Sequence, residues 1–300
     1  MKRIFTAASL LVAAAALAAG SPAAAETQVA GNPQIKTQYV PPMFLELSER
    51  MKKRRVLEEY SQFMSPLRLK APLTVSMEEC GNGLQGVNSD YQFDRHYIQL
   101  CYDFIDFVEN EAAVPQDQLP SPLNDAKKYP GLGLMPGFTR SEVIIGGTVG
   151  VILHETGHAV FDIQGIPRLG REEDAADEIS GLVMLQFGKP IARTMIKGII
   201  NVWHHFQARF GFNERASLGD VHSISIERAI NYLCLAYGQD PASFQDLASQ
   251  WLPEQRKANC RNEYQQALLA FKKTVLPDVD LEQLKKVQAM PILQADDAKL

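Results

Sequence analysis

The chain has 300 residues, of which 46% are hydrophobic and 22% are charged, a composition typical of globular proteins that bury a large core. Its formal net charge of −5 gives no electrostatic basis for binding nucleic acid or an anionic membrane surface, so we expect no nucleic-acid partner. The sequence contains no internal repeat or heptad run, which argues against a repeat array or a coiled coil.

The first 25 residues have the pattern of a secretory signal peptide. Two basic residues precede an apolar stretch that ends near residue 20, and Ala23-Ala24-Ala25 then offers a small-residue cleavage site. An uncleaved membrane anchor is the alternative, but the stretch is short and mostly alanine, which partitions weakly into lipid. We expect cleavage after Ala25, a periplasmic or secreted mature chain, and no later stretch that is long and apolar enough to span a bilayer.

The four cysteines agree with export, because none belongs to a Cys-x-x-Cys pair typical of metal or redox sites. Four cysteines allow three pairings. We predict the pairing that is local in sequence, Cys80–Cys101 and Cys234–Cys260, which closes two short loops. Four buried free thiols are the alternative, which an oxidising compartment disfavours.

We predict a single domain over 43–300, preceded by a loose, polar, proline-containing lead-in at 26–42. The part up to about residue 140 holds the strands. Apolar and polar residues alternate at 73–80 and 96–102, with turn-forming residues between these segments. Helices are expected on either side of the strands, at 43–64 and 103–112.

A long segment dense in proline and glycine, 115–139, leads to a part over 141–300 that is mostly helical. Loops of this length are often functional or mobile. Ser141 followed by Glu142 predicts the cap of a long apolar helix. Early strands and late helices predict an α+β fold, with a small N-terminal mixed sheet and a helical C-terminal half. The expected helices lie at 141–164, 171–188, 190–210, 223–237, 241–251 and 255–274.

The apolar helix at 141–164 contains polar residues that can bind a metal ion. His154 and His158 lie one turn apart on one face of the helix, so both imidazoles can reach the same ion. Glu155 lies beside them, where its carboxylate can accept a proton from water. Histidines satisfied within the core are the alternative. The pattern is the His-Glu-x-x-His arrangement of zinc peptidases and predicts one Zn²⁺ per chain.

A catalytic zinc ion takes three protein ligands, and the next helix offers acidic candidates for the third. A reversal through 165–170 would bring that helix back against the first. Glu173 and Asp177 share one of its faces, so one carboxylate can bind the metal while the other orients a histidine. Asp174 and Glu178 have the same spacing, and solvated acids at a helix start are the alternative for most of the cluster. Spacing therefore leaves open the choice among Glu172, Glu173, Asp174, Asp177 and Glu178.

The segment EDAAD at 173–177 resembles the Glu-x-x-x-Asp element of gluzincins, the thermolysin-like class of zinc peptidases. In that class the glutamate binds zinc and the aspartate supports the first histidine. The resemblance implies Glu173 as the third ligand, Asp177 as the partner of His154, and a zincin-like fold.

The chain also resembles an uncharacterised bacterial metallopeptidase family. The matching elements lie at 80–104, 153–180 and 219–241, and the resemblance covers most of residues 70–265. NSDY at 88–91 resembles an edge-strand motif of neprilysin-like peptidases, which implies that Asn88 contacts the substrate backbone, although Ser89 and Asp90 depart from the pattern.

DVHSIS at 220–225 resembles the thermolysin segment whose histidine stabilises the oxyanion. The resemblance implies this role for His222, with Asp220 or Arg228 in support. A loop histidine that caps the following helix is the alternative. His96, His204 and His205 lack a partner pattern and are expected to be structural, packing or surface residues.

Together these resemblances imply a zinc metallopeptidase that acts on peptides or proteins, with Glu155 as general base. One alternative is an inactive, peptidase-like zinc-binding module that uses 115–140 as a partner surface, although the intact Glu155 argues against it. Another is a different metal-dependent hydrolase, acting for example on peptidoglycan cross-links, because pocket loops decide the substrate.

Overall fold

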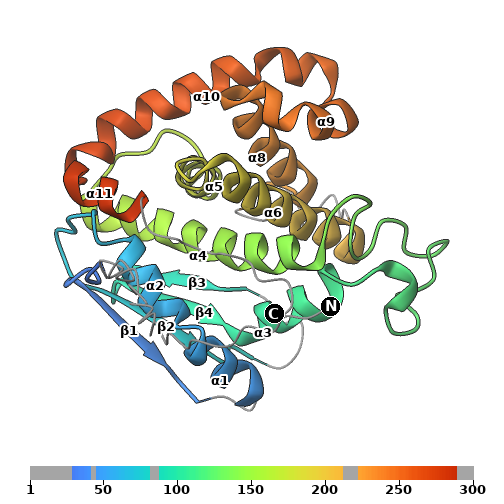
Figure 1. Cartoon of the computed structure of the whole chain (residues 1–300), viewed down its shortest axis with the longest axis horizontal. Coiled ribbons are helices and arrows are strands. Elements are labelled where there is room, and N and C mark those ends of the chain that lie inside the picture. The colour runs from blue at the N-terminus through green and yellow to red at the C-terminus, as the bar shows by residue number, and fades with distance from the viewer. Residues whose placement is uncertain (1–28, 42–44, 82–87, 212–221, 289–300) are drawn as a thin grey trace, which may run out of the picture.

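A mixed sheet and a layer of long helices lie on opposite sides of one central helix, α4 (Arg140–Gln164) (Figure 1). This computed structural model describes residues 29–41, 45–81, 88–211 and 222–288. The predicted signal peptide at 1–25 lies outside the described residues. The predicted α+β architecture, with its small N-terminal mixed sheet and helical C-terminal half, is confirmed.

The sheet contains, in spatial order, β1 (Ile35–Tyr39), β2 (Leu73–Glu78), β4 (Tyr97–Cys101) and β3 (Asp90–Gln92). β2 lies parallel to both β1 and β4, whereas the edge strand β3 runs antiparallel to β4. β2 and β4 were predicted. The prediction of a loose lead-in at 26–42 is wrong, because this segment contains β1, whose backbone pairs with β2 and whose first residue is buried.

The helix predicted over 43–64 is divided into α1 (Leu45–Lys53) and α2 (Val56–Phe63). Arg55 lies at the break with a left-handed backbone, φ 58°. Four consecutive basic residues at 52–55 end α1, where the helix dipole favours them, but their mutual repulsion opposes a further turn. The next helix, α3 (Tyr102–Phe107), continues through a π-helical turn at Val108–Ala112.

α4 starts from a different cap than the one predicted. Thr139, not Ser141, is the N-cap: its Oγ1 accepts a hydrogen bond from Glu142 N at 3.2 Å. Glu142 Oε2 in turn accepts one from Thr139 N at 2.8 Å, which completes a capping box. At its other end the helix stops at Gly165, which has φ 64°.

α4 is long and apolar enough to cross a membrane by length and composition, so the prediction that no later stretch has these properties is wrong. Of its most apolar window, 83% is buried inside the protein. β3 and β4 pack on one side of this helix, and helices pack on the other. Its apolar residues thus serve as the centre of the core.

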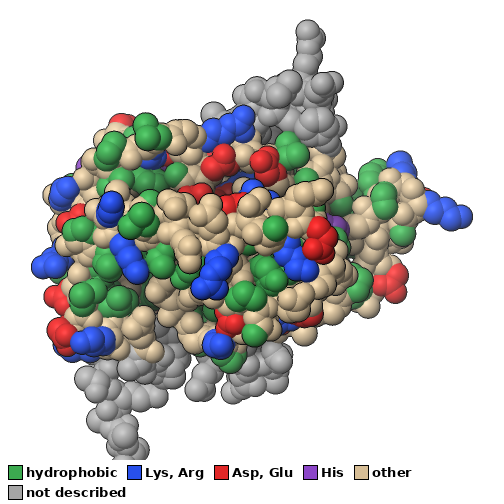
Figure 2. All heavy atoms as spheres, turned by 90° about the horizontal axis from the view of Figure 1, so that it is seen from above, with side chains coloured by type: hydrophobic (Ala, Val, Ile, Leu, Met, Phe, Trp, Pro, Cys, Tyr) green, Lys and Arg blue, Asp and Glu red, His purple; other side chains and the backbone are tan. Residues whose placement is uncertain are grey.

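The helical layer agrees with the predicted helices apart from one addition, α11. α5 and α6 pack directly on α4, and α8 contacts α5, α6, α9 and α10 (Figure 1). On the face seen from above, basic side chains are scattered among acidic and hydrophobic ones (Figure 2). The helices are α5 (Glu172–Met184), α6 (Lys189–Phe210), α8 (Ser225–Gln239), α9 (Pro241–Trp251), α10 (Glu254–Thr274) and α11 (Leu281–Gln288).

The long segment 115–139 is attached to α6 by three buried polar side chains spaced four residues apart, Lys197, Asn201 and His205. These side chains bind, in that order, Gly137 O at 3.0 Å, Met135 N at 2.8 Å and Gly133 N at 2.8 Å. Because each bond satisfies a backbone group of the loop, much of this segment is an anchored part of the fold. His205 is thus a packing residue, as expected.

Both predicted cysteine pairings are confirmed. Cys80 and Cys101 join the end of β2 to the end of β4, with their Cα atoms 5.4 Å apart. Cys234 and Cys260 join α8 to α10, with their Cα atoms 4.9 Å apart.

Candidate metal centre

Two histidines of α4 and one glutamate of α5 converge on a single point. The Nε2 atoms of His154 and His158 lie 3.1 and 3.2 Å from Glu173 Oε2, and 3.2 Å from each other. Zinc bonds of about 2.0–2.1 Å in tetrahedral geometry separate neighbouring ligand atoms by roughly 3.3 Å. These three residues, the His–His–Glu group, therefore have the spacing needed to hold a metal ion.

The other nitrogen of each imidazole faces a carboxylate. His154 Nδ1 lies 2.8 Å from Asp177 Oδ1, and His158 Nδ1 lies 3.0 Å from Glu172 Oε1. Hydrogen bonds to these carboxylates keep a proton on each Nδ1, so an imidazole that gives up its Nε2 proton directs the Nε2 lone pair at the common point. Two lone pairs and an anionic oxygen at this separation repel one another unless a cation lies between them. The donor set fits a divalent metal.

The charges around the His–His–Glu group also favour a cation. Burial lowers the pKa of His154, but the carboxylates of Asp177 and Glu173 outweigh burial and raise this pKa to about 9. Burial raises the pKa of Glu173, yet hydrogen bonds from the neighbouring histidines hold it well below its usual range. The pocket thus stabilises positive charge next to an anionic carboxylate.

Asp177 is fixed in a buried ionic network that sequence reasoning did not find. Arg228 donates to both of its oxygens, from Nε at 2.6 Å and from Nη2 at 2.7 Å, and Tyr232 donates its hydroxyl to Oδ1 at 3.0 Å. The guanidinium also lies over the Trp203 ring, 3.6 Å from the centroid. Although burial raises the pKa of Asp177, Arg228 holds it well below its usual range, so Asp177 stays anionic beside His154.

Arg228, which was suggested as a support for His222, binds Asp177 through its guanidinium. Asp220, the other suggested support, lies outside the described residues. The four-residue spacing of Arg228 and Tyr232 on the buried face of α8 was a signal that could have revealed the network.

The structure separates the acidic candidates for the third ligand. Glu172 faces the outer nitrogen of His158 and pairs with Arg168 at 2.6 Å. Asp174 accepts a hydrogen bond from Ser223 Oγ at 2.6 Å, and Glu178 is exposed. Of the five acids, Glu173 is the one that belongs to the His–His–Glu group.

Gly157 allows α4 and α5 to approach each other closely beside this group. A Cβ atom at Gly157 would lie 2.9 Å from Ala176 Cα, closer than real Cβ contacts allow. The missing side chain lets α5 bring Glu173 and Asp177 within reach of the histidines.

The His–His–Glu group opens into a cavity of about 620 Å³, which we call the metal-site cavity. Glu155, 5% exposed, lines this cavity, and burial raises its pKa. A second cavity of about 270 Å³, the side cavity, has Trp203 and Phe206 in its wall. Asn88 and His222 line both cavities, and His222 Nε2 lies 3.0 Å from Glu173 Oε2. Glu155, Asn88, His222 and the His–His–Glu group thus line one cavity, whereas Asp177 lies behind His154.

Residues 42–274 match the model of a protein family described as "Putative metallopeptidase". The chain belongs to this family. The match includes all the residues of the His–His–Glu group and the helices that carry them. No curated protein and no solved structure matches the chain. Membership of this metallopeptidase family supports a peptidase-like function that depends on a metal ion.

In this family member, Glu172, Arg228 and Tyr232 extend the predicted site. Two of them act on Asp177 and one acts on His158, so all three influence the His–His–Glu group indirectly. Sequence spacing identified the residues that converge but not those that hold them.

Proposed function

We propose that this chain is an exported, zinc-dependent metallopeptidase that hydrolyses peptide bonds in peptide or protein substrates. His154, His158 and Glu173 hold one Zn²⁺ per chain. The observation that carries the proposal is the convergence of their ligand atoms next to a buried carboxylate, Glu155, at an open cavity. Family membership supports the same class of reaction.

When bound, Zn²⁺ supplies a Lewis acid that lowers the pKa of water to about 7 and polarises a carbonyl group. Glu155 takes a proton from the attacking water and returns it to the leaving amine. Burial raises the pKa of Glu155, which suits a group that both accepts and releases a proton.

We assign two further roles around the metal-site cavity. His222 donates a hydrogen bond to the oxygen that becomes negative, because its side chain lies beside Glu173 and lines the cavity. Asn88 contacts the substrate backbone, since it lies two residues before the edge strand β3 and lines the same cavity. Asp177 keeps His154 oriented through its buried hydrogen bond.

We also propose export, with residues 1–25 removed as a signal peptide. The basic start, the apolar stretch and the small residues before the cleavage position support this proposal. The two disulfides support an oxidising compartment.

Glu155→Gln tests the mechanism, because it removes the general base and keeps the size of the side chain. We expect hydrolysis of a fluorogenic peptide library and of casein to fall by about 10²–10⁴-fold. Metal analysis should still find one zinc ion per chain. His158→Ala, the matched control for metal loss, should lose both zinc and activity.

A Glu155→Gln protein that cleaves as fast as the wild type would overturn the mechanism. A wild-type protein that binds one zinc ion and cleaves neither substrate would instead favour the inactive zinc-binding module.

A further inference from the structure

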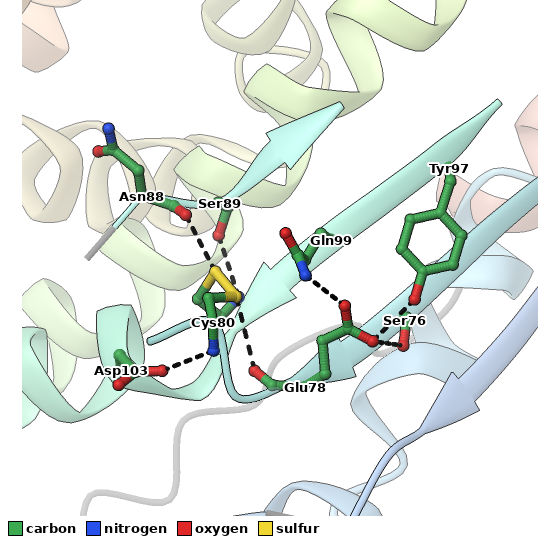
Figure 3. Close-up of a disulfide and its surroundings, with 9 residues drawn as sticks. Ser76, Glu78, Cys80, Asn88, Ser89, Tyr97, Gln99 and Asp103 are labelled. Atoms are coloured by element: carbon green, nitrogen blue, oxygen red, sulfur yellow. Dashed lines mark hydrogen bonds between the residues drawn. A yellow bond between two sulfur atoms is a disulfide. The ribbon is translucent and has the colours of Figure 1, made fainter. Parts of the chain in front are cut away.

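The Cys80–Cys101 disulfide lies beside Asn88 and Ser89, which we call the Asn88–Ser89 wall (Figure 3). Cys101 N donates a hydrogen bond to Ser89 Oγ at 3.2 Å, and Cys101 Sγ lies 3.0 Å from Asn88 O. Asn88 and Ser89 line the metal-site cavity, and Asn88 also lines the side cavity. One half of the disulfide therefore touches both residues of this wall.

The other side of the disulfide is attached to a well-connected part of the sheet. Cys80 N donates to Asp103 Oδ2 at 3.0 Å, in the first turn of α3. Glu78, two residues before Cys80, accepts hydrogen bonds from Tyr97 Oη at 2.7 Å and from the Gln99 amide (Figure 3). These bonds tie β2 to β4 next to the disulfide, which makes this end of the sheet a firm support.

The wall itself has weaker attachments of its own. β3 is only three residues long, and its ladder begins at Asp90. Among the strands that the structure describes, it pairs with β4 alone. Asn88 and Ser89 precede that ladder, so the strand pairing does not reach them. Asn88 and Ser89 are instead held against β4 by their contacts with Cys101, which is 1% exposed.

We propose that the Cys80–Cys101 disulfide positions the Asn88–Ser89 wall for substrate binding. This inference rests on the proposed function. With the disulfide intact, Cys101 holds Asn88 at the boundary between the two cavities and Ser89 in the wall of the metal-site cavity. Without it, the wall loses its fixed support, and a substrate must then order this edge at a cost in binding free energy.

The second disulfide provides a matched control. Its cysteines are 26 positions apart, against 21 for Cys80 and Cys101, so the two closed loops predict similar stabilisation. Cys234 and Cys260 join α8 to α10, and neither of them is among the described residues that line the two cavities. Removing either disulfide should therefore lower the melting temperature, but only the removal of Cys80–Cys101 should affect the Asn88–Ser89 wall.

The experiment compares Cys80→Ser/Cys101→Ser with Cys234→Ser/Cys260→Ser in the full chain, on the best-cleaved peptide of the fluorogenic library. We expect the first variant to raise KM by about tenfold and to change kcat by less than about threefold. Both variants should keep one zinc ion per chain, and the second should keep the wild-type KM. An equal KM in both variants, or a zinc loss that accounts for the kinetic change, would overturn the inference.

Hydrogen exchange gives a readout that does not depend on hydrolysis. We expect backbone amides at 88–92 to exchange faster in Cys80→Ser/Cys101→Ser, and at the wild-type rate in Cys234→Ser/Cys260→Ser. Unchanged exchange in both would overturn the inference. A wild type that cleaves nothing would overturn the proposed function alone, because the exchange measurement still decides whether the disulfide holds this wall.

Ser89→Ala covers the case in which the first double variant does not fold. This substitution removes the acceptor for Cys101 N and leaves the disulfide in place. We expect faster exchange at 88–92 and a higher KM. Wild-type values of both quantities would contradict the positioning role.

Discussion

At the scale of single residues, the two histidines of the His–His–Glu group have carboxylate partners that are held with different firmness. Asp177 is 4% exposed and receives bonds from Arg228 and Tyr232. Glu172 has a side chain 24% exposed and, besides its contact with His158, forms an ion pair with Arg168. A buried carboxylate bound by a guanidinium cannot readily turn towards water, whereas a partly exposed one can. His154 is thus oriented more firmly than His158.

Asp177→Asn should lower zinc affinity by about 10–100-fold, because an amide orients His154 less well and does not increase its basicity. Glu172→Gln should lower the affinity less, since water can replace its contact with His158. Competition with a chromophoric chelator measures both affinities.

Asp174→Asn is the control for these substitutions, because Asp174 lies in the same helix but bonds to Ser223 instead of a ligand histidine. Its zinc affinity should remain that of the wild type. If Asp177→Asn and Glu172→Gln lower the zinc affinity equally, the burial of the Asp177 network does not contribute to zinc binding.

At the scale of elements, the candidate centre is a property of a helix pair. α4 supplies both histidines, and α5 supplies Glu173 and the partners of the outer nitrogens. Neither helix holds the complete ligand set, so the distance between them determines whether the three ligand atoms can meet. Gly157 sets that distance, since its Cα faces Ala176 with no side chain between them.

Gly157→Ala should push α5 away from α4. The new methyl group would meet the backbone of Ala176 at 2.9 Å, and a backbone atom cannot move without its helix. We expect zinc affinity to fall, together with a loss of about 1–3 kcal/mol in the free energy of unfolding. Chelator competition and urea denaturation measure the two effects.

Gly147→Ala is the matched control on α4. There the new methyl group meets side-chain ends, Val202 Cγ2 at 2.7 Å and Val108 Cγ1 at 3.3 Å, and does not press on α5. Zinc affinity should stay at the wild-type value. If Gly157→Ala also binds zinc normally, the close helix contact is not what positions Glu173.

The sequence predicted the features that depend on neighbouring residues and missed those that depend on residues far away in the chain. α4 and the helices from α5 to α10 follow from apolar periodicity, and the disulfides follow from local cysteine spacing. β1 was missed because its strand character depends on pairing with β2, more than thirty residues away. At the site, spacing predicted the facing histidines, but Glu173 required a family resemblance and Arg228 required the packing of α8 on α5.

At the scale of the whole molecule, the candidate centre connects parts of the chain that are far apart in sequence. α4 lies between the sheet and the helical layer, α5 packs on it, and α8 reaches the centre through Arg228 (Figure 1). α8 is in turn attached to α10 by a disulfide that closes a loop worth about 3 kcal/mol in the chain-entropy account. A ligand that joins α4 to α5 therefore stabilises the core around which the other elements pack.

This coupling predicts that zinc raises the melting temperature of the whole domain. A ligand that binds only the folded state contributes about 4.1 kcal/mol when its free concentration is 1,000 times its dissociation constant. For a domain of this size, each kcal/mol shifts the melting temperature by roughly 2–4 °C. Differential scanning calorimetry with buffered zinc should therefore show an increase of roughly 10 °C, and a chelator should reverse it.

Two variants decide whether this shift comes from the candidate centre. Glu155→Gln should keep the full increase, because it removes the proposed base and leaves the ligands intact. His158→Ala should lose most of it. An increase of the same size in His158→Ala would mean that zinc stabilises the fold from another position. The convergence of His154, His158 and Glu173 would then need a different cation or a purely structural explanation. Because the shift requires no substrate, it tests metal binding independently of catalysis.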